Sequence, residues 1–511
     1  MKTKKEQDPS RREFVKKGAM AMAAFSIVPR HVLGKGFNAP SDTLYIATVG
    51  AGGKGESDIS GFVGSGKAKM AFLCDVDSDR GGGSFKKYPE AKVYEDWRVL
   101  FDKESKNFDA VSVSTPDHTH AVVGTAAITL GKHTWIQKPL AHDIFEARTL
   151  AALAKKYKVV TQMGNQGSSN NGVRQMREWY EAGLVGDVTE VFCWTDRPDG
   201  WWPQGGLKWP TATDTPPATL NWDLWQSTAK GRPYPAPLNA KGDRVLPFNW
   251  RAWWNYGTGV VGDMGAHIME APMTVLGLGH VSTVHTSVST PGQGYRNAEF
   301  PDVAPHSSHT TLTFPKSAKT SGPVKLHWMD GGIMPTRPDE LDPSEAFVPD
   351  AAGGGGMLFI GTKGKMMAGV YSSGARLLPA SRMDETVNIP VKYERVPQGA
   401  NGHYAQWVLA CLAGYGKMET SSPFEKAALV TENMLVANLA IRGFNVPKAV
   451  VATTASATPA PAGGGRQGRI TYPVRGITMV WDAENMKVTN VDEVNQFVKR
   501  EYREGWKLSG I

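Results

Sequence analysis

The chain has 511 residues, of which 41% are hydrophobic and 21% are charged. This composition is typical of a globular protein with a large core and excludes a wholly disordered or fibrous chain. The length suggests roughly two to four domains, and the formal net charge of +8 taken alone would suggest nucleic acid or another acidic partner.

Most of that positive charge lies at the N-terminus. Residues 1–40 contain nine Lys and Arg against three Asp and Glu, a net charge of +6, which leaves +2 for residues 41–511. A nearly neutral body gives no reason to expect a nucleic-acid partner. The basic excess therefore belongs to a leader segment.

The leader carries a motif of its own. Residues 10–16 read Ser-Arg-Arg-Glu-Phe-Val-Lys and resemble the twin-arginine export signal, and a weakly apolar stretch follows at residues 18–28. That stretch is too short to span a bilayer and fits the hydrophobic region of a signal peptide. We therefore expect the twin-arginine export machinery as a partner and a periplasmic location; a basic tail with a chance Arg-Arg pair is the alternative.

The body of the chain begins with a strand and a glycine motif. Residues 44–49 form an apolar, β-branched run that predicts a buried strand. Residues 50–55 follow as Gly-Ala-Gly-Gly-Lys-Gly, a G-x-G-x-x-G motif. Such glycines allow a tight turn and close approach to a pyrophosphate, whose charge the next helix N-terminus favours. The predicted phosphate-binding residues are Gly50, Gly52, Gly53 and Gly55; a glycine-rich turn of another α/β domain is the alternative.

An acidic residue completes this predicted nucleotide site. The next expected strand, residues 68–74, ends at Asp75, twenty residues after Gly55. A carboxylate at this place binds the ribose hydroxyls of an adenosine. Asp77 and Asp79 add negative charge that disfavours a 2′-phosphate, so NAD is favoured over NADP.

The pattern of strands and helices continues along the chain. Strands are predicted at residues 108–114, 133–136 and 159–162, and helices at residues 121–130 and 143–157. This alternation predicts parallel βαβ units, with functional residues at the carboxyl ends of the strands. Thr115, Pro116, His120 and Lys138 all follow predicted strands.

Together these marks resemble the Gfo/Idh/MocA family, the relatives of glucose–fructose oxidoreductase and inositol dehydrogenase. The matching residues are the glycine motif, Asp75, Thr115-Pro116 with His120, Lys138-Pro139, and residues 263–267, which read Asp-Met-Gly-Ala-His as in the family's D-x-G-x-H. One departure is Gln137, where the family usually has Glu. The resemblance implies that Thr115, Pro116, His120 and Lys138 contact the cofactor, with His120 lining the nicotinamide pocket.

The resemblance also implies a domain organisation. We expect an N-terminal Rossmann dinucleotide-binding domain at residues 41–165 and a C-terminal α/β domain with a large, mostly antiparallel open sheet at residues 166–447. A low-complexity insertion at residues 448–469 and a segment at residues 470–511 that packs on the fold would follow. In relatives the sheet commonly forms the oligomer interface, so a homo-oligomer, a dimer or tetramer, is expected.

Three residues are the expected catalytic group. Removing hydride from an alcohol carbon requires a base within hydrogen-bond reach of the hydroxyl. By resemblance, His267 is that base, Asp263 is its support or a substrate contact, and Lys138 stabilises the developing alkoxide. On a helix, Asp263 and His267 would share a face. Apart from the resemblance, a solvated lysine and a local Asp–His pair remain alternatives.

A metal site is not expected. The three cysteines, Cys74, Cys193 and Cys411, are far apart and form no metal-binding pair or disulfide framework. Asp263, His267 and Glu270 could imitate a facial metal triad, but no second cluster of ligands accompanies them.

Tryptophans gather in one irregular stretch. Nine of the 16 lie between residues 194 and 254, among many prolines and glycines. Indole rings suit the apolar faces of sugars, although such rings also fix long loops to a core. Arg197, Trp201 and Trp202 are the predicted substrate contacts.

These features lead to one main hypothesis and two alternatives. The main hypothesis is an NAD(P)-dependent oxidoreductase that acts on a sugar, sugar derivative or cyclitol. Because free NAD would be scarce after export, the cofactor is expected to be held tightly and regenerated in place. The alternatives are a redox-neutral NAD-dependent glycoside hydrolase, working by oxidation, elimination, hydration and reduction, and a non-catalytic sugar-binding protein.

Overall fold

A computed structural model of the chain describes residues 42–290, 302–347, 354–449 and 470–511. The leader predicted at residues 1–40 and most of the insertion predicted at residues 448–469 lie outside the described residues. Within the described ranges, no helix has both the length and the apolar character needed to cross a membrane.

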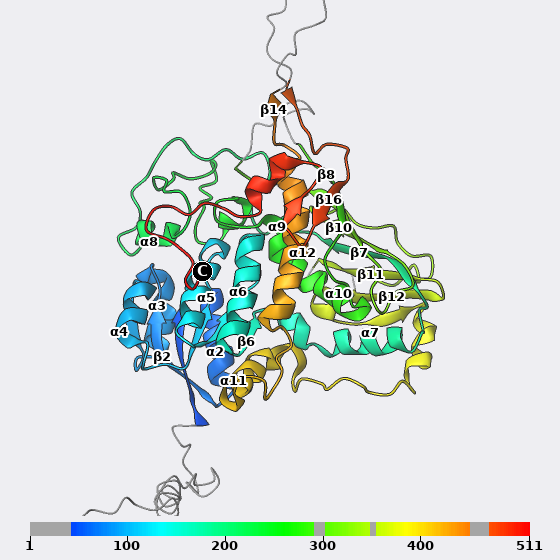
Figure 1. The fold of residues 1–511 in the computed structure, drawn as a ribbon, viewed down its shortest axis with the longest axis horizontal. Coiled ribbons are helices and arrows are strands. Elements are labelled where there is room, and N and C mark those ends of the chain that lie inside the picture. Colours follow the sequence, from blue (N-terminus) through cyan, green and yellow to red (C-terminus); the bar gives the residue numbers. More distant parts are fainter. Residues whose placement is uncertain (1–41, 291–301, 348–353, 450–469) are drawn as a thin grey trace, which may run out of the picture. The chain divides into compact units, whose positions relative to one another are not determined.

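A six-stranded parallel sheet forms the first part of the fold (Figure 1). The strand order is β3-β2-β1-β4-β5-β6. The order reverses between β1 and β4, and ligands of such sheets bind at the carboxyl ends of the strands at this point. The strands are β1 (Leu44–Val49), β2 (Ala68–Cys74), β3 (Lys92–Tyr94), β4 (Ala110–Val113), β5 (His133–Ile136) and β6 (Thr161–Met163).

Helices connect these strands as expected for βαβ units. They are α2 (Lys54–Gly64), α3 (Ser78–Lys87), α4 (Trp97–Glu104), α5 (Asp117–Thr129) and α6 (Ile144–Tyr157). Helix α5 begins at Asp117 rather than at residue 121, because Pro116 occupies its N-cap position and cannot continue a strand ladder. His118 and His120 therefore lie in the first turns of a helix and not in a loop.

A nine-stranded sheet forms the second part, in the order β13-β12-β11-β7-β10-β9-β8-β16-β17. Every pairing is antiparallel except β7 with β10. The large, mostly antiparallel sheet is thus confirmed. Its strands are β7 (Val188–Thr195), β8 (Thr283–Val288), β9 (Ser308–Phe314), β10 (Val324–Met329), β11 (Gly355–Gly361), β12 (Gly364–Gly369), β13 (Arg376–Leu378), β16 (Met479–Asp482) and β17 (Lys487–Val488).

The remaining elements complete the chain between and around the sheets. The short strands β14 (Lys448–Ala449) and β15 (Ile470–Thr471) pair with each other on either side of the undescribed segment. The helices are α7 (Asn171–Glu181), α8 (Trp222–Gln226), α9 (Gly259–Ile268), α10 (Glu270–Leu276), α11 (His403–Ala413) and α12 (Phe424–Gly443). Short 3₁₀ turns are η3 (Gln166–Ser169), η4 (Asn249–Ala252), η5 (Val370–Ser372), η6 (Ala380–Thr386), η7 (Gly399–Gly402) and η8 (Asp492–Phe497).

Two helices tie the sheets together. Helix α12 lacks a polar face, as expected for a helix buried on all sides, and it packs against both α6 and α9 (Figure 1). Helix α11 lies inside the range predicted for the second domain, yet its Trp407 packs on Phe62 and Trp135 of the parallel-sheet core, with ring centroids 5.1 and 5.7 Å away.

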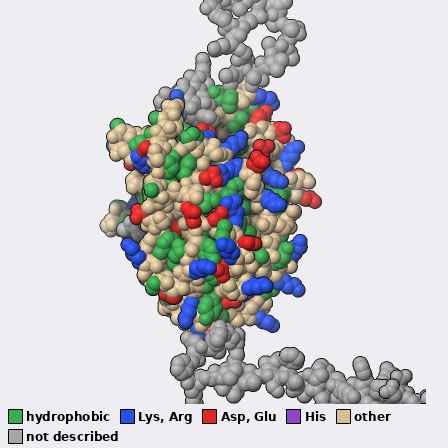
Figure 2. Space-filling model, turned by 90° about the vertical axis from the view of Figure 1, so that its left-hand side faces the viewer, with side chains coloured by type: hydrophobic (Ala, Val, Ile, Leu, Met, Phe, Trp, Pro, Cys, Tyr) green, Lys and Arg blue, Asp and Glu red, His purple; other side chains and the backbone are tan. Residues whose placement is uncertain are grey.

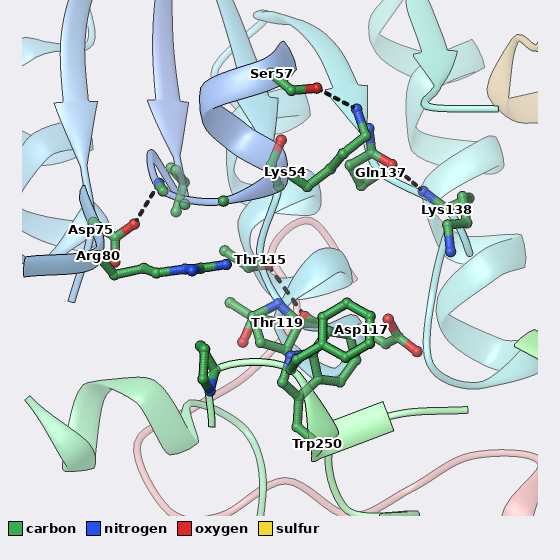
Figure 3. A pocket seen from close by; sticks show the side chains of 18 of the residues that line it. Lys54, Ser57, Asp75, Arg80, Thr115, Asp117, Thr119, Gln137, Lys138 and Trp250 are labelled. Carbon is green, nitrogen blue, oxygen red and sulfur yellow. Dashed lines mark hydrogen bonds between the residues drawn. The ribbon is translucent and has the colours of Figure 1, made fainter. Parts of the chain in front are cut away.

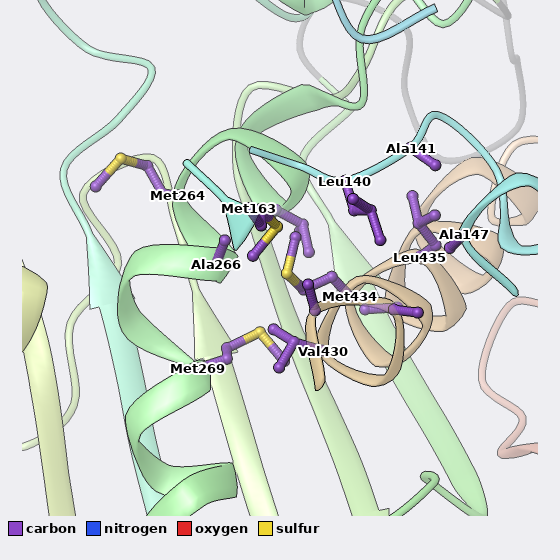
Figure 4. Close-up of a cluster of buried hydrophobic side chains, with 14 of the residues drawn as sticks. Leu140, Ala141, Ala147, Met163, Met264, Ala266, Met269, Val430, Met434 and Leu435 are labelled. Carbon is purple, nitrogen blue, oxygen red and sulfur yellow. The ribbon is translucent and has the colours of Figure 1, made fainter. Parts of the chain in front are cut away.

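A buried apolar cluster fixes the helix that carries the predicted catalytic pair. Figure 4 shows Leu140, Met163, Ala266 and Met434 meeting between α9, α12 and the segment that follows β5. All four side chains are fully buried. Since close-packed interiors resist displacement, this core holds α9 rigidly beside Lys138-Pro139.

The surface seen in Figure 2 carries both signs of charge. This side of the molecule bears α3, α4 and α8, and its basic and acidic side chains are interleaved. Mixed charge of this kind is typical of a soluble protein surface.

Candidate active site

A cavity of about 730 Å³ opens at the carboxyl ends of the parallel strands. Figure 3 shows Asp75 and Arg80 at one end and Lys138 at the other, with Thr115, Asp117 and Trp250 between them. We call these the nucleotide end and the substrate end. The nucleotide end has a floor of glycine backbone, whereas the substrate end consists of charged and polar side chains.

The glycine loop forms the floor of the nucleotide end. Gly50 has a φ of +85°, and a Cβ there would lie 2.7 Å from the carbonyl oxygen of Ser114. A Cβ at Gly55 would collide with the carbonyl oxygen of Gly50. With Gly53 at the N-cap, no side chain caps the first amides of α2, which leaves them available to a phosphate.

Asp75 is fixed beside this loop. Its Oδ2 accepts the N–H of Gly52 at 2.9 Å, and its Oδ1 accepts the N–H of Asp77 at 3.1 Å. Burial raises the pKa of Asp75 to about 6, and the two backbone donors oppose that rise. The carboxyl is therefore mostly ionised at neutral pH and suits ribose hydroxyls.

Arg80 adds a cation that the glycine motif does not indicate. A Cβ at Gly53 would collide with its guanidinium, so the side chain lies directly on the loop. It extends along the cavity toward Thr115 (Figure 3). A guanidinium on this loop would suit the negative charge of a pyrophosphate.

Aromatic residues from distant segments enclose the nucleotide end. Trp97, Trp225 and Trp506 line the cavity, with the rings of Trp97 and Trp506 centred 6.3 Å apart. Arg98 lies over the Trp506 ring at 4.6 Å. These flat apolar walls offer a purine a stacking surface.

The glycine cradle, the acid and the aromatic walls together fit a dinucleotide. The loop leaves the space that a phosphate backbone needs, Asp75 offers acceptors to a ribose, and the cavity is long enough to place Lys138 at its opposite end. Two of the cofactor-binding residues proposed from the sequence, Gly55 and His120, do not line this cavity. The others do: Gly50, Gly52, Gly53, Asp75, Thr115, Pro116 and Lys138.

At the substrate end, one carboxylate gathers three cations. Asp263 Oδ1 accepts from Lys138 Nζ at 2.7 Å and from Arg251 Nε at 3.0 Å, and Oδ2 accepts from Arg197 Nη1 at 2.9 Å. All four side chains are nearly buried. Helix α9 supplies the carboxylate, and three separate segments supply the cations.

This cluster determines the charge of its members. Burial alone would raise the pKa of Asp263, but the three cations hold it well below its ordinary value. Burial lowers the pKa of Lys138, and the Asp263 carboxylate opposes that fall. Asp263 therefore stays ionised. Lys138 is a cation that loses its proton more readily than an exposed lysine does.

His267 is held by an asparagine and not by Asp263. Its Nδ1 lies 2.8 Å from Asn165 Oδ1. The Asn165 amide nitrogen donates to the carbonyl of Ala266 at 2.6 Å and to Glu270, which also accepts from Ser168. The amide oxygen must therefore face the imidazole, so Nδ1 carries the hydrogen and Nε2 carries the lone pair.

The imidazole is neutral. Burial, with a further contribution from the nearby Lys138 charge, lowers the pKa of His267 well below its ordinary value. Its ring also meets Tyr371, with centroids 4.6 Å apart. A neutral histidine that lines a cavity and whose Nε2 carries the lone pair is the form that a general base requires.

Two family models match the chain. Residues 44–165 match the model described as the oxidoreductase family, NAD-binding Rossmann fold, and residues 171–300 match the C-terminal alpha/beta domain of that oxidoreductase family. Over these residues the chain belongs to the Gfo/Idh/MocA oxidoreductase family. Its first part is an NAD-binding Rossmann domain, and the family assignment made from the motifs is confirmed.

Individual relatives are distant. The uncharacterized oxidoreductase YfiI of Bacillus subtilis is 30% identical over 174 residues, which cover 31% of this chain and 44% of that protein. Inositol 2-dehydrogenase 1 of Saccharopolyspora erythraea is 28% identical over 153 residues, 30% of this chain and 45% of that protein. The chain thus spans less than half the length of these curated relatives.

One solved structure is similar in fold over most of this chain. The WlbA dehydrogenase from Bordetella pertussis, in complex with NADH and UDP-GlcNAcA, is 14% identical, with a TM-score of 0.50. The match covers 78% of this chain and 95% of that chain.

The departure from the Gfo/Idh/MocA pattern at Gln137 has a local explanation. Its Nε2 donates at 2.8 Å to Asp58 Oδ2, which also accepts from Ser114 at 2.8 Å. Asp58 is fully buried and forms an ion pair with Lys54. A glutamate at position 137 would place a second carboxylate against Asp58, so an amide suits this family member.

Several residues predicted from the sequence lie elsewhere than expected. His120 is fully buried, with its ring nitrogens each 2.8 Å from the carbonyl oxygens of Pro139 and Thr115. It holds the two pocket segments together and does not line the cavity. Trp202 is also buried, and its Nε1 donates to Gln204 at 2.9 Å. Trp202, predicted as a substrate contact, therefore does not line the cavity.

Other predicted residues do meet at the substrate end. Arg197 and Trp201 both line the cavity, and the Arg197 guanidinium lies 3.9 Å from the Trp201 ring centroid. The expected support of His267 by Asp263 is replaced by Asn165, because the three cations engage the carboxylate. Within the described ranges, no three His, Cys, Asp or Glu side chains are placed to hold a metal.

Proposed function

We propose that the protein is an NAD-dependent oxidoreductase that acts on the hydroxyl of a sugar, sugar derivative or cyclitol and holds its cofactor tightly. The supporting observation is the convergence of His267, Lys138 and Asp263 at the far end of a dinucleotide cavity. The matched inositol 2-dehydrogenase agrees with an alcohol of this class.

Each residue has a distinct part in the proposed reaction. Bound NAD supplies the hydride acceptor. His267 takes the hydroxyl proton at Nε2, because Nδ1 is committed to Asn165. Lys138 donates a hydrogen bond to the developing oxyanion, and Asp263 keeps the lysine protonated and in place.

The C-terminal segment supports tight retention of the cofactor. Arg500 bonds the buried Glu146 at 2.7 Å, and Arg503 pairs with Asp223 at 2.6 Å. These anchors hold Trp506 against the nucleotide end. Release of a bound dinucleotide would require this anchored segment to open, which slows dissociation.

Tight retention of the cofactor affects which net reaction is possible. We propose that the protein is exported by the twin-arginine pathway to the periplasm, where a captive cofactor must be regenerated in place. A second candidate is therefore redox-neutral glycoside hydrolysis, in which hydride returns to the same sugar. We also propose a homo-oligomer assembled through the nine-stranded sheet.

The test begins with the purified protein. Denaturation should release about one NAD or NADH per chain, identified by mass, and sugars or cyclitols should change the nicotinamide absorbance. His267→Ala and Lys138→Ala should each abolish that change; full turnover in both variants would contradict the proposed function. Absence of any absorbance change with every alcohol, together with absence of glycoside hydrolysis, would leave the sugar-binding alternative in its place. Deuterium from solvent at the carbon beside the oxidised one would favour the hydrolase.

A further inference from the structure

The charges at the substrate end do not balance among the described residues. Lys138, Arg197 and Arg251 face the single carboxylate of Asp263. Among the described residues, Asp117 is a further carboxyl that interacts with Lys138 and Arg251. It is buried and accepts from Thr258 at 2.7 Å. In the part of the chain that the structure describes, three cations thus face two carboxyl groups.

Two other acidic groups nearby are already paired. Asp58 forms an ion pair with Lys54, and the exposed Asp199 pairs with His306 at 3.2 Å. At least one positive charge is therefore left over in a nearly buried site. An uncompensated buried charge is costly unless a ligand brings the opposite charge.

The phosphates of a dinucleotide do not fill this need. Their cradle is the glycine loop with Arg80, which lies at the opposite end of the cavity from Lys138 (Figure 3). The excess charge belongs to the end that meets the substrate.

The arginines retain unused donors. Arg197 Nε is buried and bonds no described residue, although Nη1 is engaged by Asp263. Arg251 uses Nε on Asp263 and Nη1 on the carbonyl of Phe248. A guanidinium has five N–H groups arranged to bind an oxyanion, so both side chains can hold Asp263 and a ligand together.

An aromatic platform lies beside these donors. Trp201 lines the cavity under Arg197 with 47% of its surface exposed, and Trp250 lines it beside Arg251. A half-exposed indole is suited to the apolar face of a pyranose.

We propose that the substrate is an acidic sugar, a pyranoside bearing a single carboxylate that Arg197 and Arg251 bind. An excess of one positive charge matches a monoanion better than a dianionic phosphate ester. This inference rests on the proposed function, since it assigns the substrate class of the same site.

The experiment compares matched glycosides that differ only at C6. Calorimetric titration of the purified protein with methyl β-D-glucuronide and methyl β-D-glucoside, and with the corresponding galactosides, gives acid-to-neutral affinity ratios. We expect at least one acid to bind tenfold or more tightly than its neutral partner, a difference of about 1.4 kcal/mol. Arg251→Gln and Arg197→Gln should each reduce that ratio at least tenfold.

Arg244→Gln is the matched control, because Arg244 forms an exposed ion pair with Asp214; it should keep the native ratio. No acid binding more tightly than its neutral partner, native ratios in both variants, or a preference for methyl glucoside 6-sulfate over the glucuronide would overturn the proposal. Because these are binding measurements, an acid preference without hydride transfer would contradict the proposed function alone.

Discussion

The two ends of the cavity are made from different parts of the chain. The nucleotide end has a floor of backbone from one continuous stretch, residues 49–80, and its specificity rests on glycines without side chains and on Asp75. The substrate end is made of charged and polar side chains that come together from far apart, with Lys138 and Asp263 separated by 125 residues.

This difference predicts different responses to mutation. A backbone cradle fails when an added atom fills it, whereas a cluster of buried charges fails when one member is removed and the others are left uncompensated. The nucleotide end should therefore be sensitive to added volume, and the substrate end to lost charge.

Asp263→Asn should have the largest effect. It leaves three nearly buried cations without their shared carboxylate, so we expect the free energy of unfolding to fall by about 3–5 kcal/mol and hydride transfer to fall at least about 10²-fold. Urea denaturation and single-turnover absorbance measure the two effects.

Asp214→Asn serves as the control, since Asp214 pairs with Arg244 on the exposed surface and its loss should change the free energy of unfolding little. Equal destabilisation by the two variants would show that the charge cluster has no special place in the fold.

Gly50→Ala tests the nucleotide end. The positive φ costs about 1–3 kcal/mol in a residue with a side chain, and the new Cβ would press on the Ser114 carbonyl. We expect at least about tenfold less nucleotide per purified chain. Gly66→Ala is the matched control, because Gly66 has a φ of +68° but nothing within 4 Å of its Cβ position; equal nucleotide loss there would remove the steric argument.

The same contrast determines what the sequence could predict. Strands 44–49, 68–74 and 133–136, the glycine motif and Asp75 were predictable because local periodicity and spacing define them. The partner of His267 was not, because Asn165 lies 102 residues away and the spacing to Asp263 says only that two side chains share a helix face.

Other residues that line the cavity lie in irregular segments, where no sequence pattern indicates them. Trp201 and Trp202 are neighbours in a loop without a repeating pattern, and nothing in the sequence indicates that one lines the cavity while the other is buried. Arg80, Arg251 and Trp506 reach the cavity through tertiary contacts, and no motif marked them.

Asn165→Ala tests the positioning of the base. Loss of the amide frees the His267 ring to turn and to change tautomer, so we expect kcat to fall about tenfold with KM little changed. In Asn165→Asp a carboxylate would favour the imidazolium and raise the pKa of His267, so the acid limb of the pH–rate profile should move to higher pH. A lower kcat in both variants with an unmoved pH profile would assign Asn165 a purely structural role.

Trp506→Ala tests whether the aromatic ring of Trp506, in addition to the glycine loop, slows dissociation of the bound dinucleotide. Loss of a stacking surface costs about 1–3 kcal/mol per base in nucleic-acid sites, so we expect the bound dinucleotide to dissociate about tenfold faster. Trp506→Phe should restore most of the retention because it keeps a flat apolar ring. Equal release rates for the native, Ala and Phe proteins would exclude a role of this segment in retention.

Acidification tests the support behind the substrate end. His403 is fully buried, donates from Nε2 to the Met163 carbonyl at 2.9 Å and accepts from Ser169 Oγ at 2.6 Å. Burial lowers the pKa of His403 to about 3, so below about pH 6.5 the unfolded chain binds a proton that the folded chain does not.

Folding stability should therefore fall as the pH drops from about 6.5 toward 3, by about 1.4 kcal/mol per pH unit from this residue. His403→Gln removes that dependence, whereas His285→Gln, at an exposed position, should keep it. Urea denaturation at pH 7 and pH 5 measures both slopes. Equal slopes for the native protein and His403→Gln would contradict the assignment of this titration to His403.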